Sequence, residues 1–155
     1  MKNVRSFIKS FPGAKVEELQ HYVTPHLEAQ KPDISIIHVG GNNVNLKNLE
    51  DINVDEISEN IVNVGKKCAS FNSTVFISSI LVKKNYRVSA VIRRVNEKLQ
   101  DLCRKYGFHF ISNDNIGREF LCDDGIHLLD DGTYIFAGNF VRNVNGIICN
   151  LDELD

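Results

Sequence analysis

A polar stretch in the last third of the chain, "CDDGIHLLDDG" from Cys122 to Gly132, places Asp124 three residues before His127. A histidine close behind an aspartate can belong to an ordinary turn, to a metal site, or to a nucleophilic triad. In a triad Asp124 would hold the imidazole in one tautomer, and His127 would take a proton from the nucleophile and return it to the leaving group. The local sequence leaves these three interpretations open.

Two further segments combine glycine with other turn-forming residues. They are Pro12-Gly13-Ala14 and Gly40-Gly41-Asn42-Asn43. Each segment alone is typical of a simple turn. A backbone N–H at a glycine and the side-chain amide of an asparagine are also neutral donors, which an oxyanion formed during acyl transfer requires.

Short apolar runs precede these polar segments and predict the strands that position them. Ile34 to Val39, "ISIIHV", lies between Pro32-Asp33 and Gly40, which is typical of a strand buried on both faces. Thr74 to Ile80 and Phe108 to Ile111 have the same pattern, and Ser6 to Phe11 is a weaker fourth candidate. The loops around Gly13, Asn42 and His127 would then lie at the carboxyl ends of strands, where ligands bind in parallel sheets.

Apolar residues at helical spacing predict helices between these strands and after the last one. The residues are Val16, Leu19 and Val23; Ile57, Ile61, Val64, Cys68 and Phe71; Val88, Val91, Val95, Leu99, Leu102 and Tyr106; and Tyr134, Ile135, Phe140 and Val141. We expect the last helix over Gly132 to Val144, with Asp131 as its N-cap. The alternation predicts an α/β domain with a parallel sheet covered by helices on both faces, spanning residues 1–155.

Composition narrows the classes of function. The 155 residues are 43% hydrophobic and 25% charged, as in ordinary globular domains, and no apolar run approaches the ~20 residues of a membrane span. The N-terminus lacks the apolar core of a signal peptide, so we expect a cytoplasmic protein without a membrane partner. A net charge of -2 gives no basic surface for nucleic acid. The four widely separated cysteines predict reduced thiols.

Taken together, the three loops resemble the marker blocks of the SGNH, or GDSL-type, hydrolases. "SFPGA" matches the second block at Gly13, "HVGGNN" the third at Gly40 and Asn42, and "DDGIHL" the fourth at Asp124 and His127. The resemblance implies a three-layer, flavodoxin-like α/β/α fold and cofactor-free hydrolysis of a carboxylic ester or an acetylated small molecule. It assigns catalysis to His127 and Asp124 and the oxyanion hole to Gly13 and Asn42. Gly40, Gly41 and Asn43 are expected to line the substrate.

The first marker block, Gly-Asp-Ser, occurs nowhere in the sequence. The resemblance therefore implies that the chain begins just after the nucleophile and lacks the first, central strand of the sheet. Ser10 lies near the expected cleft, but it does not occupy the sharp strand-to-helix turn that exposes a nucleophile. We expect the chain as written to be inactive, and either a ligand-binding pseudo-hydrolase or a protein-interaction domain remains an alternative.

Two further expectations follow from these residues. A metal held by Asp123, Asp124, His127 and His38 would leave the Gly13 and Asn42 loops without a role, so we expect no metal. A missing central strand would leave an apolar sheet edge exposed, and such edges favour self-association. Ser78, Ser79 and His38 are expected to be buried strand or wall residues.

Overall fold

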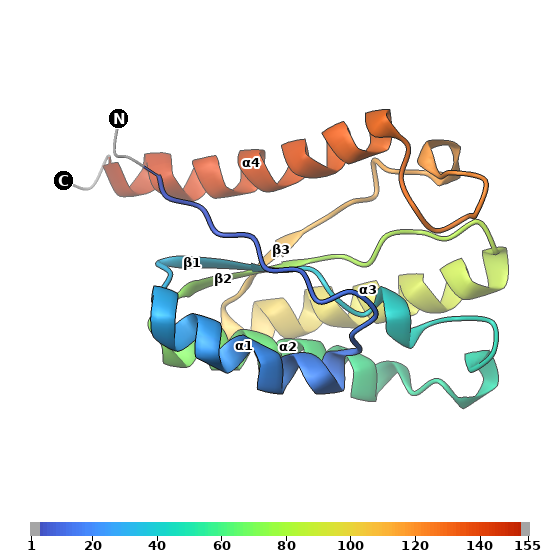
Figure 1. Ribbon diagram of the computed structural model, residues 1–155, viewed down its shortest axis with the longest axis horizontal. Coiled ribbons are helices and arrows are strands. Elements are labelled where there is room, and N and C mark those ends of the chain that lie inside the picture. Colours follow the sequence, from blue (N-terminus) through green and yellow to red (C-terminus); the bar gives the residue numbers. More distant parts are fainter. Residues whose placement is uncertain (1–3, 153–155) are drawn as a thin grey trace.

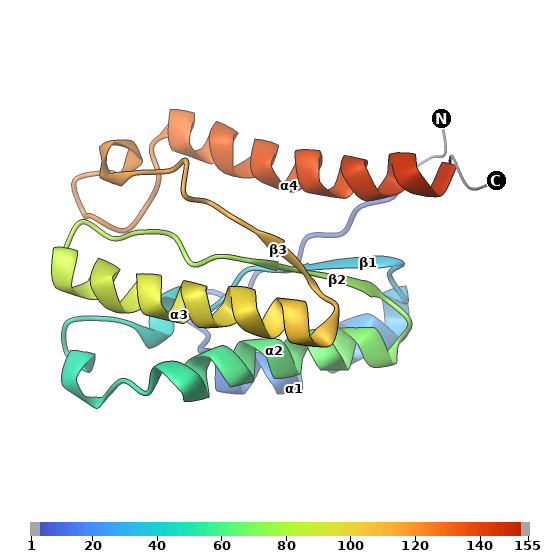
Figure 2. The same ribbon diagram turned by 180° about the vertical axis from the view of Figure 1, so that it is seen from behind.

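The computed structural model describes residues 4–152 as three layers, with one sheet between two helical layers (Figure 1). Helices α1, α2 and α3 cover one face of the sheet, and α4 covers the other (Figures 1 and 2). The helices are α1 (Val16–Gln30), α2 (Val54–Ser70), α3 (Tyr86–Tyr106) and α4 (Asp130–Asp152). The strands are β1 (Ile34–Ile37), β2 (Thr74–Ser78) and β3 (His109–Ile111), with short 3₁₀ turns η1 (Gly41–Asn43), η2 (Leu49–Asp51) and η3 (Arg118–Phe120). The three-layer prediction is confirmed.

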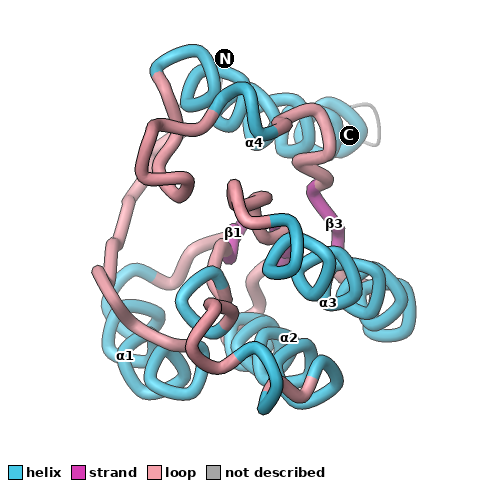
Figure 3. The backbone as a smooth tube through the Cα atoms, turned by 90° about the vertical axis from the view of Figure 1, so that its right-hand side faces the viewer, coloured by secondary structure: helices cyan, strands magenta, loops and turns pink. Residues whose placement is uncertain are grey.

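Within the described residues the sheet has three parallel strands in the order β1-β2-β3, so β1 lies at one edge. Ser6 to Phe11, predicted as a strand, is extended but pairs with no strand, so that prediction is wrong. A strand is defined by the hydrogen bonds of a neighbour, and this segment runs apart from β1 on its outer side (Figure 3).

The edge position of β1 also corrects its predicted burial. Ile36 is 39% exposed, because no strand covers it from the outer side, whereas its register partner Phe76 on the central strand is buried. The last helix is longer than predicted. It begins at Asp130, so Asp131 lies in the first turn rather than at the N-cap, and it continues past Val144 to Asp152. Both aspartates still favour the helix start electrostatically.

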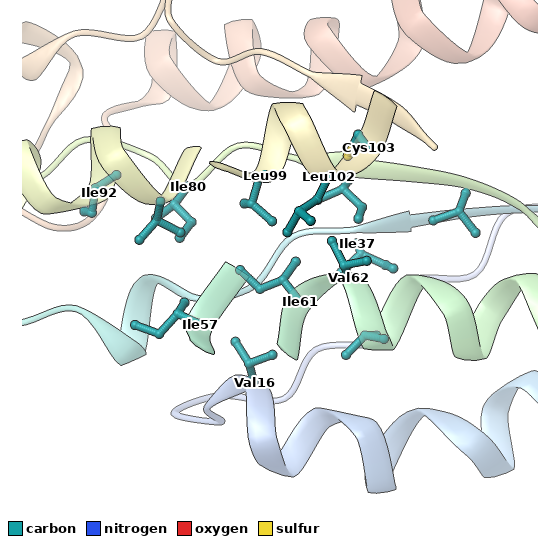
Figure 4. Close-up of a cluster of buried hydrophobic side chains, with 14 of the residues drawn as sticks. Val16, Ile37, Ile57, Ile61, Val62, Ile80, Ile92, Leu99, Leu102 and Cys103 are labelled. Atoms are coloured by element: carbon teal, nitrogen blue, oxygen red, sulfur yellow. The ribbon is translucent and has the colours of Figure 1, made fainter. Parts of the chain in front are cut away.

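The main core lies between the sheet and α1 to α3 (Figure 4). Ile61 of α2, Leu99 of α3 and Ile77 of β2 are among its fully buried side chains. The amphipathic periods of α2 and α3 dictate this arrangement, and Asn53 and Asn85 cap the two helices by accepting backbone N–H groups of their first turns.

Across the part of the chain that the structure describes, no helix has the length and apolar character needed to cross a membrane. The cytoplasmic location expected from the sequence stays a prediction. All four cysteines are free thiols, with Cys68 and Cys103 buried, Cys122 partly buried and Cys149 exposed.

Candidate active site

The loops that follow β1, β2 and β3 leave the sheet at the same end, at the right of Figure 1 and toward the viewer in Figure 3. The Gly13 turn reaches this end as well, because the extended N-terminal segment runs in the same direction before α1 begins (Figure 1). Parallel strands place all their carboxyl ends on one side, so segments far apart in sequence meet there. All the predicted site residues lie on these loops or on the Gly13 turn.

Asp124 and His127 lie on a tight hairpin between η3 and α4. The N–H of Cys122 donates to the carbonyl of His127 at 2.7 Å, and Gly125 turns the chain with a φ of +72°. A side chain at Gly125 would meet the Cβ of Lys84 at 2.6 Å, so both the conformation and the space require glycine. The side chains of Asp124 and His127 on this hairpin are both open to solvent.

The carboxylate of Asp124 is fully used by this hairpin. Its Oδ1 accepts the backbone N–H groups of Ile126 at 2.8 Å and His127 at 2.9 Å, and its Oδ2 bonds to Nδ1 of the His127 ring. The bond from His127, followed by the two backbone donors, lowers the pKa of Asp124 to about 2. An ionised carboxylate only accepts, so Nδ1 of His127 carries the hydrogen and Nε2 keeps its lone pair. With its side chain 78% exposed, His127 can act as a base toward an incoming group.

The two predicted oxyanion-hole loops lie against each other. The Nδ2 amide of Asn42 donates to the carbonyl of Ala14 at 3.1 Å, next to Gly13, whose φ is +76°. This bond uses one of the two N–H groups of the amide, and the second is left for another acceptor. The predicted meeting of the Gly13 and Asn42 loops is thus present in the structure.

Asn43, predicted to line the substrate, is buried and bonded to α1. Its Oδ1 accepts the N–H of Val16 at 3.1 Å, and its Nδ2 donates to the carboxylate of Glu17 at 3.2 Å. Gly40 has a φ of +107°, and a side chain there would meet Cδ1 of Ile80 at 2.8 Å. Gly40 and Asn43 therefore fix the loop that carries Gly41 and Asn42.

Lys83 is a residue of this region that the sequence did not single out. Its Nζ donates to the carbonyls of Gly41 at 2.6 Å and Val44 at 2.7 Å, on either side of Asn42. Partial burial lowers the pKa of Lys83 from its ordinary value. The sequence does not indicate that this lysine holds the Asn42 loop, because Lys83 and its partner Gly41 are 42 residues apart.

Two surface cavities lie near these loops. One, of about 530 Å³, is lined by Asn45, Leu46, Lys83, Lys84, Asn85, Tyr86, Val88, Asp124, Gly125 and Ile126. The other, of about 390 Å³, is lined by Ser10, Phe11, Pro12, Gly13, Ala14, Glu18 and Tyr22. His127 lines neither of the two, and they do not share a residue. The predicted single cleft containing Gly13, Asn42 and His127 stays a prediction.

Beneath these loops a chain of polar side chains connects the sheet to α4. Nδ1 of His38 lies 3.1 Å from the hydroxyl of Ser78, which accepts the amide of Asn113 at 2.8 Å. The amide of Asn139, on α4, donates to Oδ1 of Asn113 at 2.9 Å. Burial of the ring lowers the pKa of His38 to about 4, although the residue as a whole is exposed. The contacts of its ring with Ser78 and Phe136 place His38 at the surface wall of the fold and not in its core.

Within residues 4–152, His, Cys, Asp and Glu side chains form no group of three or more that could hold a metal ion. His38 is bonded to Ser78, and Asp124 to His127, so these candidate ligands are used in separate contacts.

No family model matches the sequence, and no curated protein matches it. Several solved structures do match the fold. A GDSL-like lipase from Bacteroides thetaiotaomicron has a TM-score of 0.72 at 14% identity over 87% of this chain and 73% of its own. The esterase EstA from Pseudoalteromonas sp. has a TM-score of 0.69 at 15% identity over 88% and 74%. The acetylxylan esterase Axe2 from Geobacillus stearothermophilus has a TM-score of 0.72 at 17% identity over 84% and 67%. The chain therefore has the SGNH hydrolase-like fold that its marker segments predicted.

Proposed function

We propose that the chain carries the acid-base pair and the oxyanion donors of a serine esterase, while the nucleophile is not among its 155 residues. The observation that carries the proposal is the bond between Asp124 and Nδ1 of His127, on the segment that resembles the fourth SGNH marker block. The serine chemistry is supported by Axe2, whose catalytic mutant replaces a serine by alanine.

Each group has a role in the proposed reaction. Nε2 of His127 takes the proton of the attacking hydroxyl and returns it to the leaving alcohol, while Asp124 stabilises the imidazolium between the two transfers. The N–H of Gly13 and the second N–H of Asn42 donate to the oxyanion. Gly40 and Gly41 shape the loop that carries Asn42, and Asn43 ties this loop to α1. The substrate class is a small carboxylic ester or acetylated molecule, and no cofactor takes part.

Without a nucleophile these groups cannot form an acyl-enzyme, so the 155-residue chain has no esterase activity above background. To test this, an apolar strand ending in Gly-Asp-Ser is fused ahead of Met1, and hydrolysis of a short-chain nitrophenyl ester is compared with and without the added strand. The fused protein should turn over the ester and react with a serine-directed fluorophosphonate. A fusion in which the added serine is alanine is the matched control.

In the active fusion, His127→Ala should lower the rate by orders of magnitude, and Asn42→Ala should cost about 2.7 to 4 kcal/mol of transition-state stabilisation. Turnover by the unfused chain that Ser10→Ala abolishes would reject the proposal, because Ser10 would then be the nucleophile. An inactive fusion that folds normally would reject the assignment of the Asp124 and His127 pair.

A second candidate is a non-catalytic domain that binds a ligand or a protein partner at the same place. The cavity of about 530 Å³ beside Asp124 favours the ligand-binding form of this candidate, because its volume is within the usual range for small-molecule sites. Ligand binding that persists in His127→Ala, together with an inactive fusion, would support this candidate over the esterase.

A further inference from the structure

We propose that the cavity beside Asp124 binds an organic anion with an apolar body, such as an ester whose acyl chain ends in a second carboxylate. The inference rests on the proposed function in one respect, since it treats this cavity as the ligand-binding part of the same site. Its evidence is separate from the catalytic groups. It consists of the side chains around the cavity and the charges that they leave without a partner.

The rim of the cavity is apolar. Leu46 is 56% exposed, Tyr86 is 69% exposed and Ile126 is 55% exposed. They come from three separate segments, the loops before η2 and before α4 and the first residue of α3. Large apolar side chains that gather at one cavity from different segments are typical of a binding surface. They would pack against the apolar body of the ligand.

The same cavity carries two lysines. Lys83 uses two of its three Nζ hydrogens on the carbonyls of Gly41 and Val44, which are neutral acceptors, so its charge has no acidic partner. Among the described residues Lys84 forms no ion pair either. The single acid of the lining, Asp124, is engaged by the His127 ring and by two backbone N–H groups. The cavity is therefore left with a net positive charge.

The positive charge is held in place by the backbone. The N–H of Lys84 donates to the carbonyl of Gly125 at 2.9 Å, and Ser89 accepts the N–H of Lys83 at 3.0 Å. These bonds fix the segment that connects β2 to α3 against the hairpin of Asp124. The first amides of α3 are capped by Asn85, so they are not free to hold an anion. The side chains of Lys83 and Lys84 are therefore the groups that would bind the anionic end of the ligand.

The inference is tested by binding, which needs no nucleophile. The full 155-residue chain is titrated with monomethyl suberate, which has one ester and one carboxylate, and with neutral dimethyl suberate, and backbone amide shifts are followed by NMR. The half-ester should bind about tenfold more tightly, as expected for charge-assisted contacts, and should shift the amides of Tyr86, Gly125 and Ile126. Equal binding of the two probes, no binding, or shifts elsewhere would overturn the inference.

Variants test the charge contacts and the apolar contacts of the ligand separately. Lys84→Met should reduce the preference for the half-ester to less than about threefold, while Lys67→Met, an exposed lysine on α2, should leave it unchanged. Tyr86→Ala should weaken both probes by a similar factor, because it removes apolar contact and no charge. A preference that survives the double change of Lys83→Met with Lys84→Met would also overturn the inference. These results do not depend on esterase activity, so the two proposals can fail separately.

Discussion

The face of the sheet beneath α1, α2 and α3 is apolar, whereas the face beneath α4 combines apolar side chains such as Phe76 with histidine, serine and asparagine. On β2 the alternation is direct, since Val75 and Ile77 belong to the apolar core and Ser78 points to the other face, where it bonds to Asn113. The first face stabilises the fold through burial, and the second fixes the position of α4 through directed bonds. Because the Asp124 and His127 hairpin immediately precedes α4, the polar face also positions the candidate catalytic pair.

The largest expected effect is on the apolar face. Leu99→Ala removes a fully buried side chain of α3 and should lower the free energy of unfolding by about 2 to 5 kcal/mol, because it leaves a cavity in the close-packed core. Urea denaturation followed by circular dichroism measures the loss. Leu46→Ala, at an exposed position, should change the same free energy by about 0.5 kcal/mol or less. Similar losses in both variants would contradict the assignment of the core.

A smaller effect is expected on the polar face. Asn139→Ala should cost about 1 to 3 kcal/mol of unfolding free energy, because Asn139 is 3% exposed and the change leaves Oδ1 of Asn113 buried without this donor. Asn145→Ala, at an exposed position of the same helix, controls for the helix propensity of alanine. If the two variants are equally stable, α4 is held by apolar contact instead, and the contrast between the faces is lost.

Acid should weaken the polar face before the apolar one. The pKa of His38 is about 4 in the folded protein, below its ordinary value of 6.5, so between these pH values the unfolded chain binds the extra proton. The stability contributed by His38 is complete above pH 6.5 and declines as the pH falls through about 4. The loss by pH 4 should be on the order of 1 kcal/mol, allowing for the partial exposure of the residue.

The measurement compares unfolding free energies of the native chain and His38→Gln from pH 7 to pH 4. The difference between them should narrow as the pH falls, since the variant lacks the titrating ring. This range stays above the window of Asp124, whose lowered pKa makes its own contribution decline between about 3.8 and about 2. A difference that is constant with pH would show that His38 is not held neutral by burial.

The two faces also differ in how well the sequence predicts them. The amphipathic periods of α2 and α3 locate the apolar core, because burial of one helix face imposes a regular spacing of apolar residues. Asn113 and Asn139 could not be identified, since partners 26 residues apart leave no periodic signal. The contacts of Lys83 with the Asn42 loop could not be predicted for the same reason. Ser6 to Phe11 was mispredicted as a strand because its apolar pattern says nothing of whether a neighbouring strand exists to pair with it.

The sequence predicted some contacts of the candidate site and did not indicate others. The contact between Asp124 and His127 is local and follows from their spacing of three residues on a hairpin. The contact between the Gly13 and Asn42 loops depends on the path of α1 and β1, and it was expected because both loops were placed at the carboxyl ends of predicted parallel strands. The alternation of strands and helices predicted the α/β class and the resemblance its three-layer form, but neither indicated the lysines and apolar rim of the cavity beside Asp124.

The smallest effect on folding is expected at the sheet edge, where the two faces meet. Within the described residues the outer side of β1 has no hydrogen-bonded strand, and Ile36 beside it is 39% exposed. Unpaired backbone groups beside an apolar side chain favour pairing with a second chain, so we expect concentration-dependent self-association.

Ile36→Lys should suppress this self-association, since an edge lysine opposes strand pairing. The same change should alter the unfolding free energy by about 0.5 kcal/mol or less. Tyr134→Lys, which replaces an exposed aromatic residue on α4, should leave the association intact. Sedimentation equilibrium distinguishes the outcomes, and a native chain that stays monomeric at high concentration would show that the edge of β1 is protected.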